Sequence, residues 1–257
     1  YISDTYKETS KFVANKIEQL PELSDEVTLV DFDEDAEEKI LRAIIYSHSK
    51  MPLTQIKEIV RNLRETERKE LIYEYLSRRS NRRHKPGRAL EHTFYTFDIL
   101  SNYGIYRDLQ RHRLLTQEAQ DLTVIHGYDT PKELIEAGFG KEYHACMTKA
   151  KETFKIISKE YPKEAQYVVP LGYKIRWYMK MNLREVCHLT ELRSMQQGHP
   201  DYRRVAQQIY LKVKEVHPAL SHYIKFVDMG EYEMERIEAE KKLDKKIEEI
   251  DNKYGEL

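Results

Sequence analysis

Two arginines flank a histidine in the run Gln110-Arg111-His112-Arg113, just ahead of a polar segment with β-forming residues. Each guanidinium is a rigid, planar set of donors that matches phosphate oxygens and can also stack on a ring system. The run therefore predicts a site for an anionic, planar ligand such as a nucleotide or a flavin. The alternative is a surface turn, because short motifs have low specificity and 34% of the residues are charged.

Three further motifs occur in order around this run. Glu91-His92 lies near the start of the segment 89–99 (ALEHTFYTFDI). Further along the chain, the segment 168–171 (VVPL) is followed by Asn182-Leu183-Arg184 and then by Leu192-Arg193. This succession resembles the flavin-dependent thymidylate synthase family, in which an acidic-His-x-x-x-Thr-Phe strand leads into Arg-His-Arg. A short strand containing proline and an N-x-R…L-x-L-R helix follow in that family. The resemblance covers roughly residues 85–227 and is without a gap over 91–113 and 162–193.

The resemblance implies an α+β fold, with a small antiparallel or mixed sheet flanked by many helices. It also implies an FAD cofactor and the reductive methylation of a pyrimidine nucleotide, dUMP to dTMP, with NADPH and methylenetetrahydrofolate as further reactants in an active member. The residues that it assigns to cofactor binding are Glu91, Arg111, His112, Arg113, Asn182 and His188.

Arg193 is the predicted catalytic residue, because it stands where the family has an arginine against the pyrimidine. A cation beside a uracil ring stabilises negative charge that develops on the ring carbonyls. The alternative is a surface arginine paired with Glu191 or Asp201.

The predicted substrate-binding residues depart from the family pattern. Thr116 keeps a hydroxyl position, but Asp121 stands where a second serine belongs, and Thr123 where an arginine belongs. Asp108 replaces a substrate-binding glutamine, and Gln166 replaces a phosphate-binding arginine. Two like charges about 4 Å apart repel by about 4 kcal/mol at an effective dielectric constant of 20. We therefore expect the flavin half of the site to be kept and the phosphate half to be altered. Arg107 completes the predicted substrate set, and Pro86 stands where the family has a flavin-contacting histidine.

Three functional hypotheses remain open at this point. The first is a degenerate or regulatory copy that still donates part of a flavin site, and the second is an active flavoenzyme with a different nucleotide or nucleoside-like substrate. The third is a non-catalytic RNA- or nucleotide-binding scaffold that uses the basic segment 78–88 (RRSNRRHKPGR), although such runs are often merely solvated. The expected partner is a second copy of the chain, because family members are tetramers with sites between subunits, or a second domain of the same polypeptide.

Composition limits these hypotheses. The chain has 257 residues and a formal net charge of -1, with 43 basic and 44 acidic residues, so no general basic field favours nucleic acid. No apolar run reaches the ~18–20 residues of a membrane span and no signal peptide is evident, which predicts a cytoplasmic protein. Cys146 and Cys187 lack metal-ligand spacing, so we expect reduced thiols in or near the core and no metal site. A first residue that is not Met suggests that the sequence begins within a longer polypeptide.

Hydrophobic periodicity and turn residues predict the elements. The expected strands are 27–32, 92–100, 116–126 and 168–179. The expected helices are 3–20, 34–47 with Asp33 as its cap, 52–79, one from Tyr103 that places Arg107 and Arg111 a turn apart, a short one after Pro131, 141–160, 182–195, 199–216 and 218–227. The expected divisions are a helical extension over 1–25, a main domain over 26–228 and a charged helix over 229–257.

Overall fold

Four antiparallel strands form the centre of the computed structural model, which describes residues 1–17, 24–232, 241, 243–250 and 255. In sheet order the strands are β1 (Val27–Phe32), β2 (Phe94–Asn102), β4 (Lys174–Asn182) and β3 (Thr116–Ala119). Every neighbouring pair is antiparallel. The predicted α+β class is confirmed, and the sheet is antiparallel throughout.

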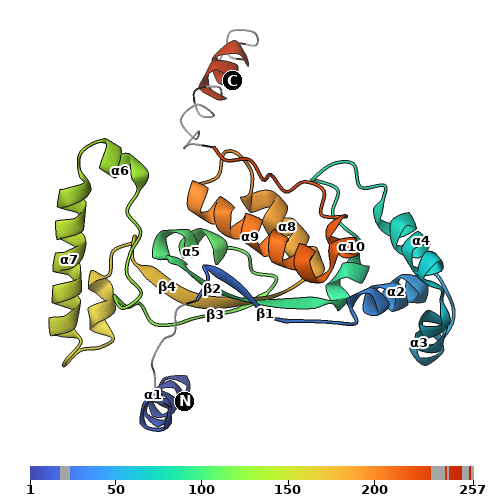
Figure 1. The fold of residues 1–257 in the computed structure, drawn as a ribbon, viewed down its shortest axis with the longest axis horizontal. Coiled ribbons are helices and arrows are strands. Elements are labelled where there is room, and N and C mark those ends of the chain that lie inside the picture. The colour runs from blue at the N-terminus through green and yellow to red at the C-terminus, as the bar shows by residue number, and fades with distance from the viewer. Residues whose placement is uncertain (18–23, 233–240, 242, 251–254, 256–257) are drawn as a thin grey trace.

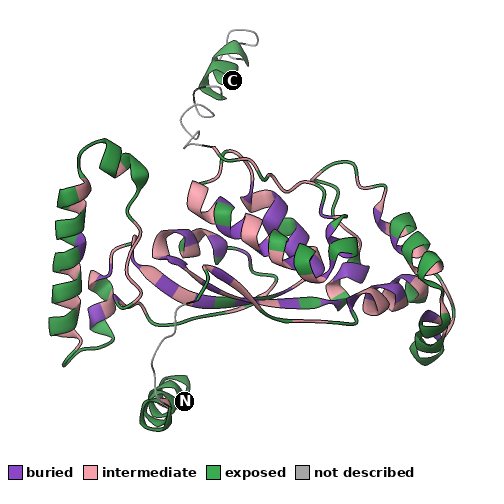
Figure 2. Ribbon diagram, viewed as in Figure 1, coloured by how far each residue is buried: buried purple, intermediate pink, exposed green. Residues whose placement is uncertain are grey.

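Helices cover one face of this sheet (Figure 1). They are α5 (Tyr103–Leu109), α8 (Leu183–Arg193), α9 (Pro200–Val216) and α10 (Pro218–Ser221). Alternate residues of β2 and β4, among them Tyr95, Phe97 and Trp177, are buried, whereas the residues between them are half-buried or exposed (Figure 2). This alternation is typical of an antiparallel sheet that is covered on one side only.

Two further groups of helices lie beyond the two ends of the strands (Figure 1). At one end are α2 (Ala36–Ser47), α3 (Leu53–Asn62), α4 (Glu65–Leu76) and the 3-10 helix η1 (Arg88–His92). At the other are α6 (Lys132–Glu136), α7 (Gly140–Ile157) and the 3-10 helix η2 (Glu164–Val168). The N-terminal helix α1 (Ile2–Lys16) has no buried residue. Among the described residues, no helix combines the length and the apolar character needed to cross a membrane.

An asparagine ends each of the two central strands and begins the helix that follows. The side-chain oxygen of Asn102 accepts a hydrogen bond from the amide of Ile105 at 3.0 Å, and that of Asn182 accepts one from the amide of Glu185 at 2.9 Å. Such caps satisfy amides that have no partner within the helix. Because β2 and β4 are antiparallel, the two helices start from opposite ends of the strand pair and run toward one another over the same face.

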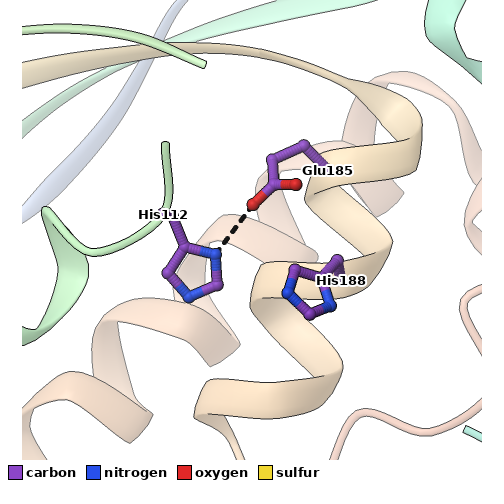
Figure 3. Close-up of side chains that lie close together, drawn as sticks. All are labelled: His112, Glu185 and His188. Carbon is purple, nitrogen blue, oxygen red and sulfur yellow. Dashed lines mark hydrogen bonds and ion pairs between the residues drawn. The ribbon is translucent and has the colours of Figure 1, made fainter. Parts of the chain in front are cut away.

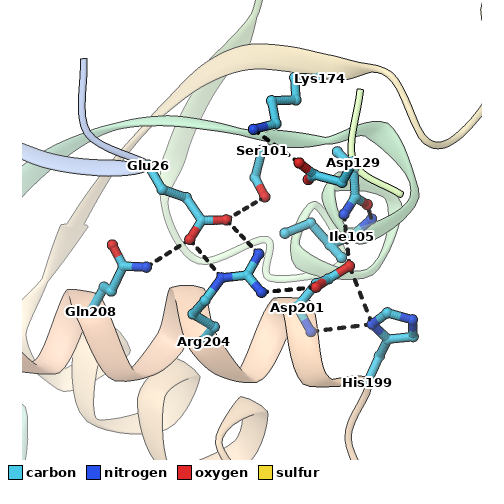
Figure 4. A network of polar contacts seen from close by, with 10 residues as sticks. Glu26, Ser101, Ile105, Asp129, Lys174, His199, Asp201, Arg204 and Gln208 are labelled. Atoms are coloured by element: carbon cyan, nitrogen blue, oxygen red, sulfur yellow. Dashed lines mark hydrogen bonds and ion pairs between the residues drawn. The ribbon is translucent and has the colours of Figure 1, made fainter. Parts of the chain in front are cut away.

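A polar network holds α9 against the sheet (Figure 4). The Glu26 carboxylate accepts hydrogen bonds from Ser101 Oγ at 2.7 Å, Arg204 Nε at 2.8 Å and Gln208 Nε2 at 2.7 Å. Burial opposes ionisation of Glu26, but these donors outweigh it, so the pKa of Glu26 is lowered. The carboxylate is therefore a fixed charge that joins the start of β1 to α9.

The long helix predicted over 52–79 is wrong. Leu63 and Arg64 have extended backbone conformations and divide it into α3 and α4. Glu67 accepts a hydrogen bond from the Arg64 amide at 2.9 Å, and Arg68 Nε donates to the Leu63 carbonyl at 3.2 Å, so local polar contacts stabilise the break. Periodicity could not show this, since α3 and α4 bury side chains of the same types on either side of the break.

Other boundaries also differ from prediction. The N-cap of α2 is Asp35, and the carboxylate of Asp33 instead accepts from the Phe94 amide at 2.9 Å and pairs with Lys39. The expected strand 168–179 begins only at Lys174, because Val168 ends η2 and a turn at 171–172 follows. The helix predicted over 218–227 ends at Ser221, and the strand predicted over 116–126 ends at Ala119.

The two ends of the chain are described in part. α1 ends at Lys16, and the predicted continuation of that helix to residue 20 lies outside the described residues. The helix predicted over 229–257 is helical at 241 and 243–250, and the rest of it beyond residue 232, apart from 255, is likewise outside them. Residues 229–232 are not helical. The division into extension, domain and tail stays a prediction.

The cysteines differ from each other. Cys187 is buried in the core, and burial raises the pKa of its thiol to about 12. Cys146 is exposed on α7, so the expectation of a position in or near the core is wrong for this cysteine.

His217 makes the stability of the fold depend on pH. Its Nδ1 and the hydroxyl of Tyr95 are 2.8 Å apart in the core, and burial lowers the pKa of His217. The unfolded chain binds a proton near pH 6.5, whereas the folded chain binds it only at lower pH. The free energy of unfolding should therefore fall as the pH drops from about 7 toward about 5. His217→Gln, which can still bond Tyr95, should flatten this slope in urea unfolding, and an unchanged slope would contradict the assignment.

Candidate functional site

The Arg-His-Arg run lies just after α5, which ends at Leu109. The predicted helix through Arg111 is therefore wrong, and Arg107 and Arg111 are not one helical turn apart. The run alternates outward, inward and outward: Arg111 and Arg113 are exposed, and His112 is buried at 5% exposure. Arg111 Nη1 lies 3.7 Å from Asp108 Oδ1. Of the three residues, only His112 enters the interior.

His112 is bonded through both ring nitrogens. Its Nδ1 lies 2.7 Å from Glu185 Oε1 (Figure 3), and its Nε2 lies 3.0 Å from Arg193 Nε. An arginine can only donate, so Nε2 must be the acceptor and the imidazole proton must be on Nδ1, donated to Glu185. The contacts thus specify one tautomer of a neutral ring.

Arg193, the last residue of α8, joins that helix to the end of α5. In addition to its bond with His112, its Nη2 donates to the carbonyl oxygen of Asp108 at 2.8 Å. The guanidinium carbon also lies 5.4 Å from the ring centre of Tyr202. A carbonyl near the C-terminus of a helix carries partial negative charge, which favours a cation there. The alternative pairing of Arg193 with Glu191 or Asp201 is not observed, since those carboxylates pair with Arg79 and Arg204.

His188 completes a cluster that the sequence analysis did not assemble. It lies one turn after Glu185 on α8, and its ring centre is 5.3 Å from that of His112. Ligand atoms of His112, Glu185 and His188 all lie within 4.8 Å of one another, a spacing within reach of a metal ion. The i, i+3 spacing of Glu185 and His188 was the available signal.

Hydrogen bonding, rather than metal binding, accounts for this cluster. A metal needs an imidazole nitrogen with a free lone pair, whereas His112 offers one nitrogen to Arg193 and carries its proton on the other. A metal on Nδ1 would move the proton to Nε2, where it would face the Arg193 N–H.

Nearby cations affect His188. Partial desolvation lowers the pKa of His188; Glu185 opposes this, and His112, Lys85 and Arg82 add to the lowering. Since Lys85 and Arg82 belong to the basic segment 78–88, that segment lies within electrostatic reach of α8.

Two arginines hold the basic segment against α8. Arg79 pairs with Glu191, with Nη1 2.6 Å from Oε1, and Glu191 is only 1% exposed. Arg184 Nε donates to the Pro86 carbonyl at 2.9 Å, and its Nη1 lies 2.6 Å from Glu91 Oε1. Hydrogen bonds from Arg88 and Arg184 lower the pKa of Glu91 against the effect of its partial burial. Glu91, predicted to bind cofactor, is thus a fixed anion that orders this segment.

A small cavity lies where the basic segment meets α4. It encloses about 190 Å³ and is lined by Tyr75, Leu76, Arg78, Arg79, His84, Lys85, Pro86, Gly87, Leu90 and Tyr223. Gly87 approaches Tyr75 so closely that a Cβ there would lie 2.0 Å from the tyrosine oxygen. This volume is below the roughly 300–1,000 Å³ of typical ligand sites.

The profile of one protein family, described as thymidylate synthase complementing protein, matches residues 28–219. The chain belongs to this family. The match runs from β1 into α10 and includes the site residues named above, except Tyr223 of the cavity lining. The resemblance read from the motifs is confirmed.

The chain is similar to several relatives, two of which are called UPF0159 proteins and one a thymidylate synthase. A "UPF0159 protein" of Chlamydia muridarum is 40% identical over 223 residues, which is 87% of the chain and 42% of the relative. A counterpart in Thermoplasma acidophilum is 35% identical over 84% of the chain and 44% of the relative. The chain thus spans less than half the length of these relatives. A "Flavin-dependent thymidylate synthase" of Sulfurisphaera tokodaii is 30% identical over 53% of the chain and 56% of the relative.

One solved structure confirms the fold. It is the crystal structure of a UMP/dUMP methylase, PolB, from Streptomyces cacaoi bound with 5-Br dUMP. Its TM-score is 0.62 at 18% identity, over 78% of this chain and 95% of that chain.

The predicted substrate residues of this family member are not gathered around Arg193. Asp121 accepts the Tyr6 hydroxyl at 3.3 Å, and Gln166 accepts the Leu122 amide at 2.8 Å. Thr116 is exposed on β3, and Arg107 is exposed on α5. Within the described chain, the only member of the set that forms a hydrogen bond with Arg193 is Asp108, through its backbone carbonyl.

Replacement of Arg79 should be strongly destabilising. Arg79→Met would leave the Glu191 carboxylate buried without its counter-charge, which costs about 3–5 kcal/mol of the free energy of unfolding. Adding Glu191→Leu should recover much of that loss. The matched control is Arg78→Met, whose exposed pair with Glu74 should be worth less than about 0.5 kcal/mol. Urea unfolding measures the free energy of unfolding of both variants. Equal losses for Arg79→Met and Arg78→Met would show that the buried pair contributes no more to stability than the exposed one.

Proposed function

We propose that this chain is an FAD-binding family member that forms one side of a flavin site, with an altered nucleotide-phosphate half. The observation that carries the proposal is the basic segment held rigidly against α8 with several of its cations free of carboxylates. When bound, FAD would supply the reducing equivalents for chemistry on a pyrimidine nucleotide.

The cations fit a pyrophosphate. Arg82, Arg83 and Lys85 form no ion pair with any described residue, although Arg79, Arg184 and Glu91 order the backbone on either side of them. Ordered cations without carboxylate partners are suited to phosphate oxygens. His188, within their electrostatic reach, would face the same ligand.

The enclosure does not fit a whole dinucleotide. The cavity beside the segment has a volume of about 190 Å³, so this cavity can hold only part of the cofactor. The missing wall would come from a second copy of this chain or from the part of the longer relatives that this chain does not span. The uncovered face of the sheet, where Phe94 and Tyr178 are each 39% exposed, provides apolar area for such a partner.

The residues at the predicted phosphate-binding positions support a degenerate or regulatory role for this copy. At the positions where the family holds phosphate, Asp121 adds negative charge and Gln166 is bonded to the backbone. The firm placement of Arg193 supports the second hypothesis, an active flavoenzyme on a different pyrimidine nucleotide or nucleoside-like substrate. NADPH oxidation that depends on an added pyrimidine nucleotide would separate the two.

The direct test is the visible absorbance of protein purified without added cofactor, followed by titration with FAD. We expect an oxidised-flavin spectrum or saturable quenching of flavin fluorescence. Arg82→Gln together with Lys85→Gln should weaken FAD binding about tenfold or more, because each removes a charge-assisted contact. The control is Lys214→Gln, an exposed lysine on α9. Flavin-free protein that does not bind added FAD contradicts the proposal and leaves the scaffold hypothesis.

Restoring the family residues tests the altered half. Asp121→Ser with Thr123→Arg removes an anion and adds a cation, so dUMP should bind about tenfold or more tightly than to the unaltered chain. Calorimetry with dUMP and with deoxyuridine measures this. Because only dUMP carries the phosphate, an equal gain for both ligands would show that these positions do not face it.

A further inference from the structure

We infer that Glu185 and His112 are positioning residues for Arg193: the carboxylate fixes the imidazole tautomer, and the imidazole fixes the guanidinium. The inference deepens the proposed function and rests on it only for the ligand that Arg193 meets. The arrangement itself can be tested without any ligand.

The three groups form a chain of charge and hydrogen bonds. Glu185 Oε1 lies 2.7 Å from His112 Nδ1, and His112 Nε2 accepts from Arg193 Nε at 3.0 Å. The side chains of His112 and Glu185 are 3% and 7% exposed. A carboxylate behind an imidazole fixes its orientation and makes the opposite nitrogen a better electron donor, as it does behind metal-bound histidines. Here that nitrogen faces a guanidinium.

The chain leaves part of Arg193 free in a fixed orientation. Its Nε and one Nη2 hydrogen are taken by His112 and by the Asp108 carbonyl. Nη1 has no hydrogen-bond partner among the described residues. One N–H of Nη1 and the second N–H of Nη2 therefore remain as two parallel donors at one edge of the guanidinium. Donors fixed before the ligand arrives need no reorganisation when charge develops on a bound carbonyl.

The role of Glu185 is not explained by folding alone. Removing a carboxylate from water is costly, and the only side-chain hydrogen bond of Glu185 in the described structure is to His112. Asn182 caps α8 through the backbone amide of Glu185, which any residue at that position would provide. An apolar residue would fill the same place at lower desolvation cost. The Glu185 carboxylate holds the His112 proton on Nδ1. In the other tautomer, the N–H at His112 Nε2 would face the N–H of Arg193.

The ligand-free test is nitrogen NMR of the whole chain. In long-range proton–nitrogen spectra, the His112 signal, identified by its loss in His112→Phe, should show a proton on Nδ1 and none on Nε2. The Nε–H of Arg193 should exchange with solvent at least tenfold more slowly than that of exposed Arg111, because it is hydrogen-bonded. A proton on Nε2, or equal exchange at the two arginines, overturns the inference.

Variants test the part played by the carboxylate. Glu185→Leu should speed exchange at Arg193 Nε–H at least tenfold, and Glu185→Gln should restore part of the protection, because its amide oxygen can accept from Nδ1. Glu215→Leu, at an exposed glutamate on α9, is the control and should leave exchange unchanged. Unchanged exchange in Glu185→Leu overturns the role of Glu185. If Glu185→Leu does not fold, Glu185→Gln is compared with the unaltered chain instead. Full protection of the Arg193 Nε–H in Glu185→Gln would show that the negative charge of Glu185 is not needed.

A ligand arm separates this inference from the proposed function. Where the chain binds dUMP, Glu185→Leu should weaken it about tenfold through the loosened Arg193. Failure of the unaltered chain to bind either dUMP or deoxyuridine, which lacks the phosphate, removes the pyrimidine contact of Arg193 from the proposed function. The NMR result then still decides whether Glu185 and His112 hold the guanidinium.

Discussion

The antiparallel pairing of β2 and β4 is the constraint on which the site depends. Because each strand ends in an asparagine that caps the following helix, α5 and α8 start at opposite ends of the pair and end close together. Arg193 bonds the carbonyl of Asp108 at that meeting point. A parallel pair would have started both helices from the same end, and their C-terminal ends would not have faced one another.

α8 carries two buried carboxylates, Glu185 and Glu191, and ends at the half-buried Arg193. Glu185 bonds the Arg-His-Arg run, Glu191 pairs with the basic segment, and Arg193 bonds both that run and the end of α5. Buried charges add little net stability, but removing one partner is costly, so each pair fixes the segment that it reaches. The helix therefore orders two loops that have few apolar contacts of their own.

Local pattern was enough for much of the fold. The strand over 27–32 was predicted with the bounds that the structure has, and the strand predicted over 92–100 is present as β2 with both ends two residues later. The break at Leu63–Arg64 and the short α5 were missed, because side chains that bond the backbone can end a helix without a glycine or proline. For the site, the motif order identified the family, but the inward turn of His112 and its contact with Glu185, 73 residues later, depend on tertiary structure that spacing does not encode.

Burial separates the predicted phosphate-binding residues from the residues around Arg193. Asp121 is exposed, and its only side-chain hydrogen bonds among the described residues are to the hydroxyl of Tyr6, so exchanging its charge has little effect on folding. Arg193 and the residues that hold it are bonded into the joint between α5 and α8, so a change there alters this joint as well as the site. Charge can therefore be exchanged at residue 121 without disturbing the fold, whereas the arrangement on α8 is tied to the packing of two helices.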